Sequence, residues 1–224
     1  MKRNHRPTRK RKALRRWGLL FVLLLLANWT SGAFALIPAQ VLWDVERSYE
    51  SGHTDVAYSV WDNRLRFGTR YYLSGNDEML LLLPVRLTPL GWTQDSGSSI
   101  LYFTQQEPYT LTESFWSRYD QHVYYFYGRI DDARIQSVKI EHWREQPPES
   151  AGASARIGEW SLVSDREDWV TKNGHTYVLA TKELTAQEGE YFIDTETTAT
   201  FYDSMGNILE TTDKIPWSYT NVIY

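Results

Sequence analysis

The N-terminal 37 residues constrain the fold most, because they combine a basic tail with an apolar run and leave only the rest of the chain to form a packed domain. Nine Lys and Arg residues precede Trp17, with no acidic residue among them. An apolar run follows from Gly18 to Ala27. This arrangement is typical of a segment that inserts into a membrane, and the basic excess holds the tail in the cytoplasm. We therefore expect a cytoplasmic tail over residues 1–16, a transmembrane or signal segment over 17–37, and an extracytoplasmic domain over 38–224.

The apolar segment has two interpretations. As a helix over residues 17–37 it is long enough to cross a bilayer, and it predicts a single-pass membrane protein whose partner there is the lipid bilayer. Ala33-Phe34-Ala35 also has the small-x-small pattern of a signal-peptidase site, and cleavage after Ala35 would give a secreted protein. We prefer the anchored form, with the N-terminus in the cytoplasm and the domain outside.

The remaining chain is acidic and free of cysteine. Nine of the 24 basic residues lie in the tail, which leaves 15 against all 28 acidic residues. This balance argues against nucleic acid as a partner. Without cysteine there is no disulfide framework, no thiolate nucleophile and no Cys-ligated zinc. Stability must come from packing, and ten Trp, fifteen Tyr and eight Phe suit a β-rich core.

A short amphipathic helix is predicted directly after the membrane segment. Pro38 suits the first turn of a helix, and Gly52 suits the position just past its end. Between them, apolar residues recur at helical spacing. They are Val41, Leu42, Val45 and Tyr49.

From Asp55 onward the pattern changes to period two, which is typical of strands separated by turns. The expected strands are 55–61, 65–73, 79–87, 99–104, 122–130, 135–143, 156–163, 176–181, 191–194, 197–202 and 208–212. The leucine run 79–83 is too short to span a membrane and predicts a buried strand. Residues 122–130 and 135–143 are expected to form a hairpin-like unit, whereas 105–120 shows no assignable pattern. We expect a mainly β domain of antiparallel sheets, with sub-halves of about 38–120 and 121–224 and a sandwich-like second half.

Three segments carry a resemblance to known sequences. They are ERSYESG at 46–52, YGRIDDARI at 127–135 and FYDSMGNIL at 201–209. They resemble a loose group of small, membrane-anchored, uncharacterised proteins of bacillus-type Gram-positive bacteria. The resemblance implies one N-terminal membrane segment, a helix, and an immunoglobulin-like β half whose last hairpin carries an Asp-x-x-Gly-Asn turn. It implies no activity and no catalytic residue, and this chain differs by a longer loop at 146–156 and a tail at 215–224.

No catalytic, metal or cofactor site is predicted. The acidic stretch 165–168 offers oxygen ligands of the kind that calcium prefers, but it lacks EF-hand spacing and is better interpreted as a solvated turn. The turn at 203–207 has residues that suit a hairpin. The five histidines, at positions 5, 53, 122, 142 and 175, have no metal-binding spacing, and no Gly-x-Ser-x-Gly elbow frames a serine.

Tryptophan offers the best candidate for a binding surface, because exposed rings on a sheet can stack on the sugars of a cell wall. Six residues have this potential. They are Trp92, Trp116, Trp143, Trp160, Trp169 and Trp217. Most of them are expected to be core residues, and Trp116 and Trp169, which stand in polar sequence, are the best candidates for exposure and for contact with a ligand.

The sequence thus predicts a membrane-tethered extracytoplasmic module for binding, interaction or sensing at the cell envelope, and not an enzyme. Its expected partner is a cell-wall polymer or another envelope protein. One alternative is a cell-wall-directed hydrolase, which would need a deep cleft with paired acids of perturbed pKa. The other is an export or folding accessory protein, which would need an exposed apolar groove or a free strand edge.

Overall fold

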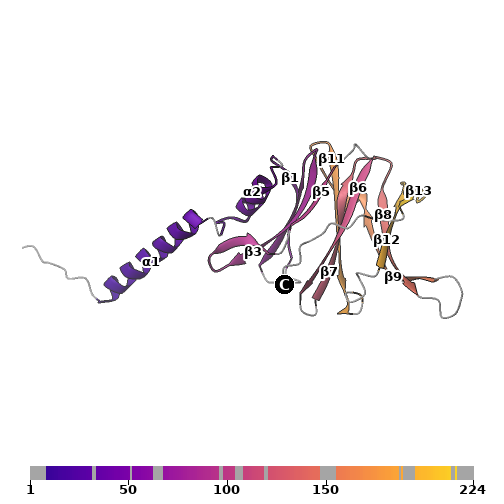
Figure 1. Ribbon diagram of the computed structural model, residues 1–224. Coiled ribbons are helices and arrows are strands. Elements are labelled where there is room, and N and C mark those ends of the chain that lie inside the picture. The colour runs from indigo at the N-terminus through magenta and orange to yellow at the C-terminus, as the bar shows by residue number, and fades with distance from the viewer. Residues whose placement is uncertain are drawn as a thin grey trace, which may run out of the picture.

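The structure is a computed structural model with two α-helices, one 3-10 helix and thirteen strands in the part of the chain that it describes. The described residues are 9–31, 34–50, 52–62, 68–95, 98–103, 108–118, 121–146, 155–186, 188, 195–212 and 215. Figure 1 shows α1 (Arg9–Ser31) extending away from the β-rich part, against which α2 (Pro38–Ser48) lies. The prediction of a mainly β domain with antiparallel sheets is confirmed.

The strands form three antiparallel sheets. The first contains β1 (Asp55–Trp61), β2 (Thr69–Gly75), β3 (Met79–Thr88) and β4 (Gly91–Gln94) in that order, with β5 (Ser99–Tyr102) also paired to β3. The second has the order β10 (Val170–Lys172), β11 (His175–Leu184), β7 (Gln121–Ile130) and β6 (Tyr109–Arg118). The third has the order β13 (Ile208–Thr212), β12 (Thr195–Tyr202), β8 (Ser137–Gln146) and β9 (Ala155–Asp165), and a short 3-10 helix, η1 (Arg166–Asp168), follows β9.

The second sheet lies between the other two, and its strand β7 is buried on both faces. Successive side chains of a strand point to opposite faces. Tyr124 and Phe126 belong to the core shared with the third sheet, which also contains Phe201. Tyr125 and Tyr127 belong to the core shared with the first sheet. A strand buried on both sides needs an almost continuous apolar run, and this explains the composition of β7.

Strand β3 has the same character in the first sheet. Leu80 and Leu82 pack toward the second sheet, whereas Leu81 and Leu83 pack toward α2. The leucine run is therefore a strand buried on both faces, as predicted. The helix contributes its apolar stripe of Val41, Leu42 and Val45 to this core.

The expected hairpin of 122–130 and 135–143 is wrong, because β7 and β8 belong to different sheets. Strand β7 already has β6 at one edge and β11 at the other, so β8 must pair elsewhere. The link between them crosses from the second sheet to the third. Arg166 fixes this link by donating hydrogen bonds from Nη1 to the carbonyl oxygens of Asp132 at 3.1 Å and Ile135 at 2.7 Å.

Several other expectations have a definite outcome. The unassigned stretch 105–120 contains β6, and β6 pairs with β7 over ten positions, so a division near residue 120 does not separate two sheets.

The turn at 203–207 is confirmed, since Asp203 Oδ1 accepts hydrogen bonds from the backbone N–H groups of Met205 and Asn207 and Gly206 has a φ of +80°. The expected strand at 191–194, most of the tail at 215–224 and most of the loop at 146–156 lie outside the described residues.

The N-terminal helix α1 ends at Ser31, before the predicted end of the membrane segment. None of the described helices combines the length and the apolar character that a membrane crossing requires. After residues 32 and 33, which the structure does not describe, Ala35 is buried and pairs with Trp92 of β4.

Candidate functional site

The two tryptophans named as the best candidates for exposure are buried, so that interpretation is wrong. Trp116 is 5% exposed and lies between the first and second sheets, with its ring stacked at 5.2 Å from that of Tyr71. Its polar neighbours in β6 do not face solvent, because Thr112, Glu113 and Ser114 are themselves fully buried. Polar sequence therefore did not indicate a solvent-facing strand.

Trp169 is buried for a different reason. It is 8% exposed and belongs to the core between the second and third sheets. Its indole Nε1 donates a hydrogen bond to Ser164 Oγ at 2.9 Å, and the Arg166 guanidinium lies over its ring. This pairing of the indole N–H is what allows a tryptophan to be buried in acidic sequence.

Two other tryptophans of the β-rich part are exposed, and sequence reasoning had placed both inside regular elements. Trp43 of α2 is 46% exposed and Trp61 at the end of β1 is 53% exposed. A signal for Trp43 was available, because at 100° per residue it lies opposite the stripe formed by Val41 and Val45. An aromatic ring on the outer face of an amphipathic helix is available to a ligand.

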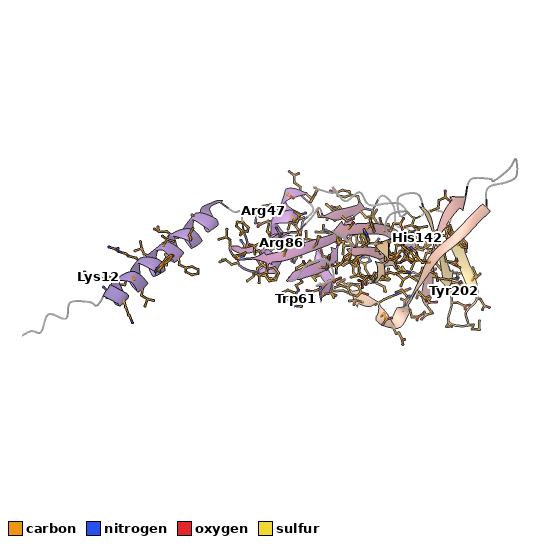
Figure 2. The ribbon with its side chains drawn as sticks, turned by 90° about the horizontal axis from the view of Figure 1, so that it is seen from below. Lys12, Arg47, Trp61, Arg86, His142 and Tyr202 are labelled. Atoms are coloured by element: carbon orange, nitrogen blue, oxygen red, sulfur yellow. The ribbon has the colours of Figure 1, made fainter. Side chains whose placement is uncertain are left out.

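Trp43 lines an open hollow of about 700 Å³ on the outer side of α2. The other lining residues are Glu46, Arg47, Glu50, Gly52 and His53. We call this hollow the α2 groove. Figure 2 shows Arg47 at the end of the β-rich part nearest α1, whereas His142 and Tyr202 lie farther along.

The floor of the α2 groove is fixed by Glu46. Its side chain is 6% exposed, and Oε1 accepts hydrogen bonds from the backbone N–H of Thr54, at 2.8 Å, and from the Thr54 hydroxyl. Oε2 lies 3.3 Å from His53 Nδ1. Between helix and strand the chain reverses through Glu50 and Gly52, which have φ values of +52° and +70°. Glu46 thus joins the helix to the segment that enters β1.

The rim of the α2 groove faces solvent and carries basic side chains together with the acidic side chain of Glu50. The side chains of Arg47 and His53 are 81% and 73% exposed, and Arg47 meets Asp44 only at 3.7 Å. The groove therefore offers an aromatic face, a guanidinium, an imidazole and the carboxylate of Glu50. Such a set can stack on a ring and hydrogen-bond to polar groups around it. In the described part of the chain, no three His, Asp or Glu side chains are grouped so that they could hold a metal ion.

A second polar cluster is enclosed between the second and third sheets. Glu113 Oε2 accepts hydrogen bonds from Tyr124 at 2.9 Å and Thr197 at 2.7 Å, and it lies 3.3 Å from His142 Nε2. Burial raises the pKa of Tyr124 well above its ordinary value, and the neighbouring Glu113 raises it further. All these side chains are inaccessible, so the cluster orders the core and cannot meet a substrate.

A third polar cluster joins the first sheet to the second at the surface. His175 lies between two carboxylates, with Nδ1 at 3.1 Å from Asp131 and Nε2 at 2.9 Å from Asp77. Asp131 also pairs with Arg129 at 3.0 Å. These groups already bond to one another, so the cluster links the first sheet to the second. The α2 groove remains the best candidate site.

Comparisons of the chain with protein-family models, with curated proteins and with solved structures found no match. The resemblance to the group of bacillus-type envelope proteins therefore stays a prediction.

Proposed function

We propose that this chain is a membrane-tethered extracytoplasmic module that binds a cell-wall polymer in the α2 groove. The observation that carries the proposal is Trp43, an exposed aromatic ring beside Arg47 and His53 on a helix that directly follows the apolar segment. The groove is an open surface. Such a surface favours binding over catalysis, because catalysis needs groups held away from water.

The proposed anchor is the apolar part of α1 from Trp17 to Ser31, which is shorter than the predicted segment 17–37 because Ala35 is already paired with Trp92, and the basic tail lies in the cytoplasm. Its apolar residues in α1 are exposed, as a membrane-embedded surface requires, and they include Leu19, Phe21 and Leu23. The anchor places the domain at the outer surface of the membrane, within reach of wall material.

The contact of Ala35 with β4 supports an uncleaved anchor over secretion. The backbone groups of Ala35 and Trp92 exchange two hydrogen bonds of 2.7 Å. Gly91 accommodates this contact, because a Cβ at that position would lie 2.6 Å from the Ala35 carbonyl oxygen. Cleavage after Ala35 would detach the residue that forms this pairing.

The arrangement of the sheets supports an immunoglobulin-like sandwich formed by the second and third sheets. Each has four antiparallel strands, and they share one core. The first sheet and α2 cover the outer face of that unit, so the α2 groove belongs to an addition that the sandwich holds in place.

A hydrolase of wall polymers is less well supported by the α2 groove. Its buried carboxylate, Glu46, is engaged by Thr54 and lies beside His53. A glycosidase needs two carboxyl groups that flank the scissile bond. Glu46 is committed to joining helix and strand, which leaves Glu50 as the carboxylate at the rim.

Binding is tested by co-sedimentation of the full-length protein, in mild detergent, with purified insoluble peptidoglycan. We expect Trp43→Ala to weaken binding about tenfold, as for the loss of a central aromatic anchor. The matched control is Tyr102→Ala, which removes another exposed aromatic ring, 55% exposed, on β5. Equal binding by the wild-type protein and the Trp43 variant would overturn the role of the α2 groove.

The tether is tested separately in cells that express the full chain. We expect an intact N-terminus in the membrane fraction and digestion of the domain by protease added from outside. A mature protein in the medium that begins at Leu36 would show instead that the segment is a signal peptide.

A further inference from the structure

We propose that the end of the β-rich part nearest α1 is a second membrane contact, which dips into the headgroup region of the outer leaflet and holds the domain against the bilayer. This inference rests on the proposed anchor. It concerns five exposed apolar side chains, which we call the apolar end. They are Leu36 at 66% exposure, Ile37 at 50%, Trp61 at 53%, Leu87 at 51% and Leu90 at 53%.

These five residues form one neighbourhood through contacts in the structure. Leu36 and Ile37 follow Ala35, which pairs with Trp92. Trp92 is also the strand partner of Leu87, and its ring lies 5.5 Å from that of Trp61. Leu90 lies in the tight turn that connects β3 to β4, next to Gly91. Figure 2 shows Trp61 at the end of the β-rich part that faces α1.

The chain itself determines what lies against the apolar end. Helix α1 ends at Ser31 and Ala35 is fixed to Trp92, so four residue steps, at most about 14 Å, separate the anchor from the sheet. Each headgroup layer is about 5–7 Å thick. With α1 in the bilayer, Ala35 and the residues around it are held at or just above this layer, whatever the conformation of the link.

The length of α1 gives a second reason. From Trp17 to Ser31 the helix rises about 22 Å, which is short of the roughly 30 Å apolar thickness of a bilayer. A membrane segment that is too short draws flanking groups toward the apolar layer. Leu36, Ile37 and the β3–β4 turn are apolar groups that follow the C-terminal end of α1. Their insertion into the outer leaflet can make up the difference between the length of the helix and the apolar thickness of the bilayer.

The aromatic and cationic groups of this region suit an interface. Tryptophan is enriched where the apolar layer meets water. The guanidinium of Arg70 lies over the rings of Trp61 and Tyr72, at 5.5 and 5.3 Å from their centroids. An arginine whose stem follows aromatic rings can keep its charge at the level of the lipid phosphates. The short link to α1 holds this surface next to the bilayer. The link does not hold it next to a second copy of the chain or another protein.

The absence of cysteine makes a site-specific test possible. Leu90→Cys places a label at the apolar end, and Leu36→Cys is a second position there should the first variant fold poorly. Met205→Cys is the matched control, because Met205 is an 81% exposed apolar residue in the turn between β12 and β13. Leu23→Cys reports on the anchor. Each full-length variant carries an environment-sensitive fluorophore in phosphatidylcholine and phosphatidylglycerol vesicles, with and without spin-labelled lipid.

We expect spin-labelled lipid to quench the label at position 90 or 36 several-fold more strongly than the label at position 205. Quenching at 23 with none at 90 and 36 would overturn the membrane contact and leave the anchor intact. Shielding of position 90 from aqueous iodide without quenching by lipid would mean that protein covers the apolar end, and it would also overturn the inference. No quenching at 23 would refute the anchor, and the inference with it.

Discussion

Replacing Gly91 with Ala tests whether the segment after α1 is fixed to the β domain. Gly91 has a φ of +139°, and a Cβ there would lie 2.6 Å from the Ala35 carbonyl oxygen and 3.3 Å from Phe34 Cβ. The nearest atom belongs to the backbone, so a side-chain rotation cannot relieve the overlap. The variant must strain residue 91 and displace Ala35 from Trp92.

The magnitude follows from these two effects. A side chain in a backbone region that favours glycine costs about 1–3 kcal/mol. Loss of the two hydrogen bonds between Ala35 and Trp92 adds about 1 kcal/mol each. We therefore expect Gly91→Ala to lower the free energy of unfolding by about 3–5 kcal/mol.

The assay is urea unfolding of the full-length protein in mild detergent, followed by tryptophan fluorescence. With an m-value of about 2.5 kcal/mol/M, the midpoint should fall by about 1–2 M. Gly174→Ala is the control, since Gly174 also has a positive φ, +86°, but no heavy atom lies within 4 Å of the added Cβ. Its expected cost is the strain alone, about 1–2 kcal/mol. A midpoint for the Gly91 variant at or above that of the control would refute the fixed link.

Two further predictions concern the hydroxyl groups of Tyr124 and Tyr58. Tyr124→Phe removes a hydrogen bond to the buried carboxylate of Glu113 and should cost about 1–3 kcal/mol in urea unfolding, whereas Tyr102→Phe, on the surface, should stay within about 0.5 kcal/mol of wild type. Equal effects of the two changes would contradict the polar cluster in the core. Burial raises the pKa of Tyr58 to about 12, so the unfolded chain loses this proton first and stability should fall as pH rises from about 10 to about 12. Tyr58→Phe should remove that part of the pH dependence in unfolding curves measured across this range, and an unchanged pH profile would refute the assignment.

The local elements of this fold could be predicted where one physical signal dominated. The alternation in 55–61 and 208–212 gave strands with the bounds that the structure has, and the leucine run at 79–83 was identified as a buried strand. Helix α2 followed from its apolar spacing and from Pro38. In α2 and in the leucine run, the observed burial is the one that each element would need on its own.

The parts that sequence reasoning missed depend on contacts between distant segments. No local pattern shows that β7 takes β6 and β11 as neighbours and so excludes β8. Strand β6 could not be assigned because its polar residues bond to partners far along the chain, as Glu113 does with Thr197. Trp116 was placed on the surface for the same reason. The candidate site did not follow from the search for tryptophans in polar sequence, although the position of Trp43 opposite the apolar stripe of α2 indicates an exposed ring.

The burial of β7 on both faces makes the three sheets one cooperative unit. Its rings complete the core on each side, so opening either interface exposes residues that the other interface needs in register. The backbone amides of β7 should therefore exchange with solvent only through global unfolding, and they should be the slowest in the molecule. A load applied at the distal turn of β12 and β13 would then be transmitted through β7 to the first sheet and, through Ala35, to α1.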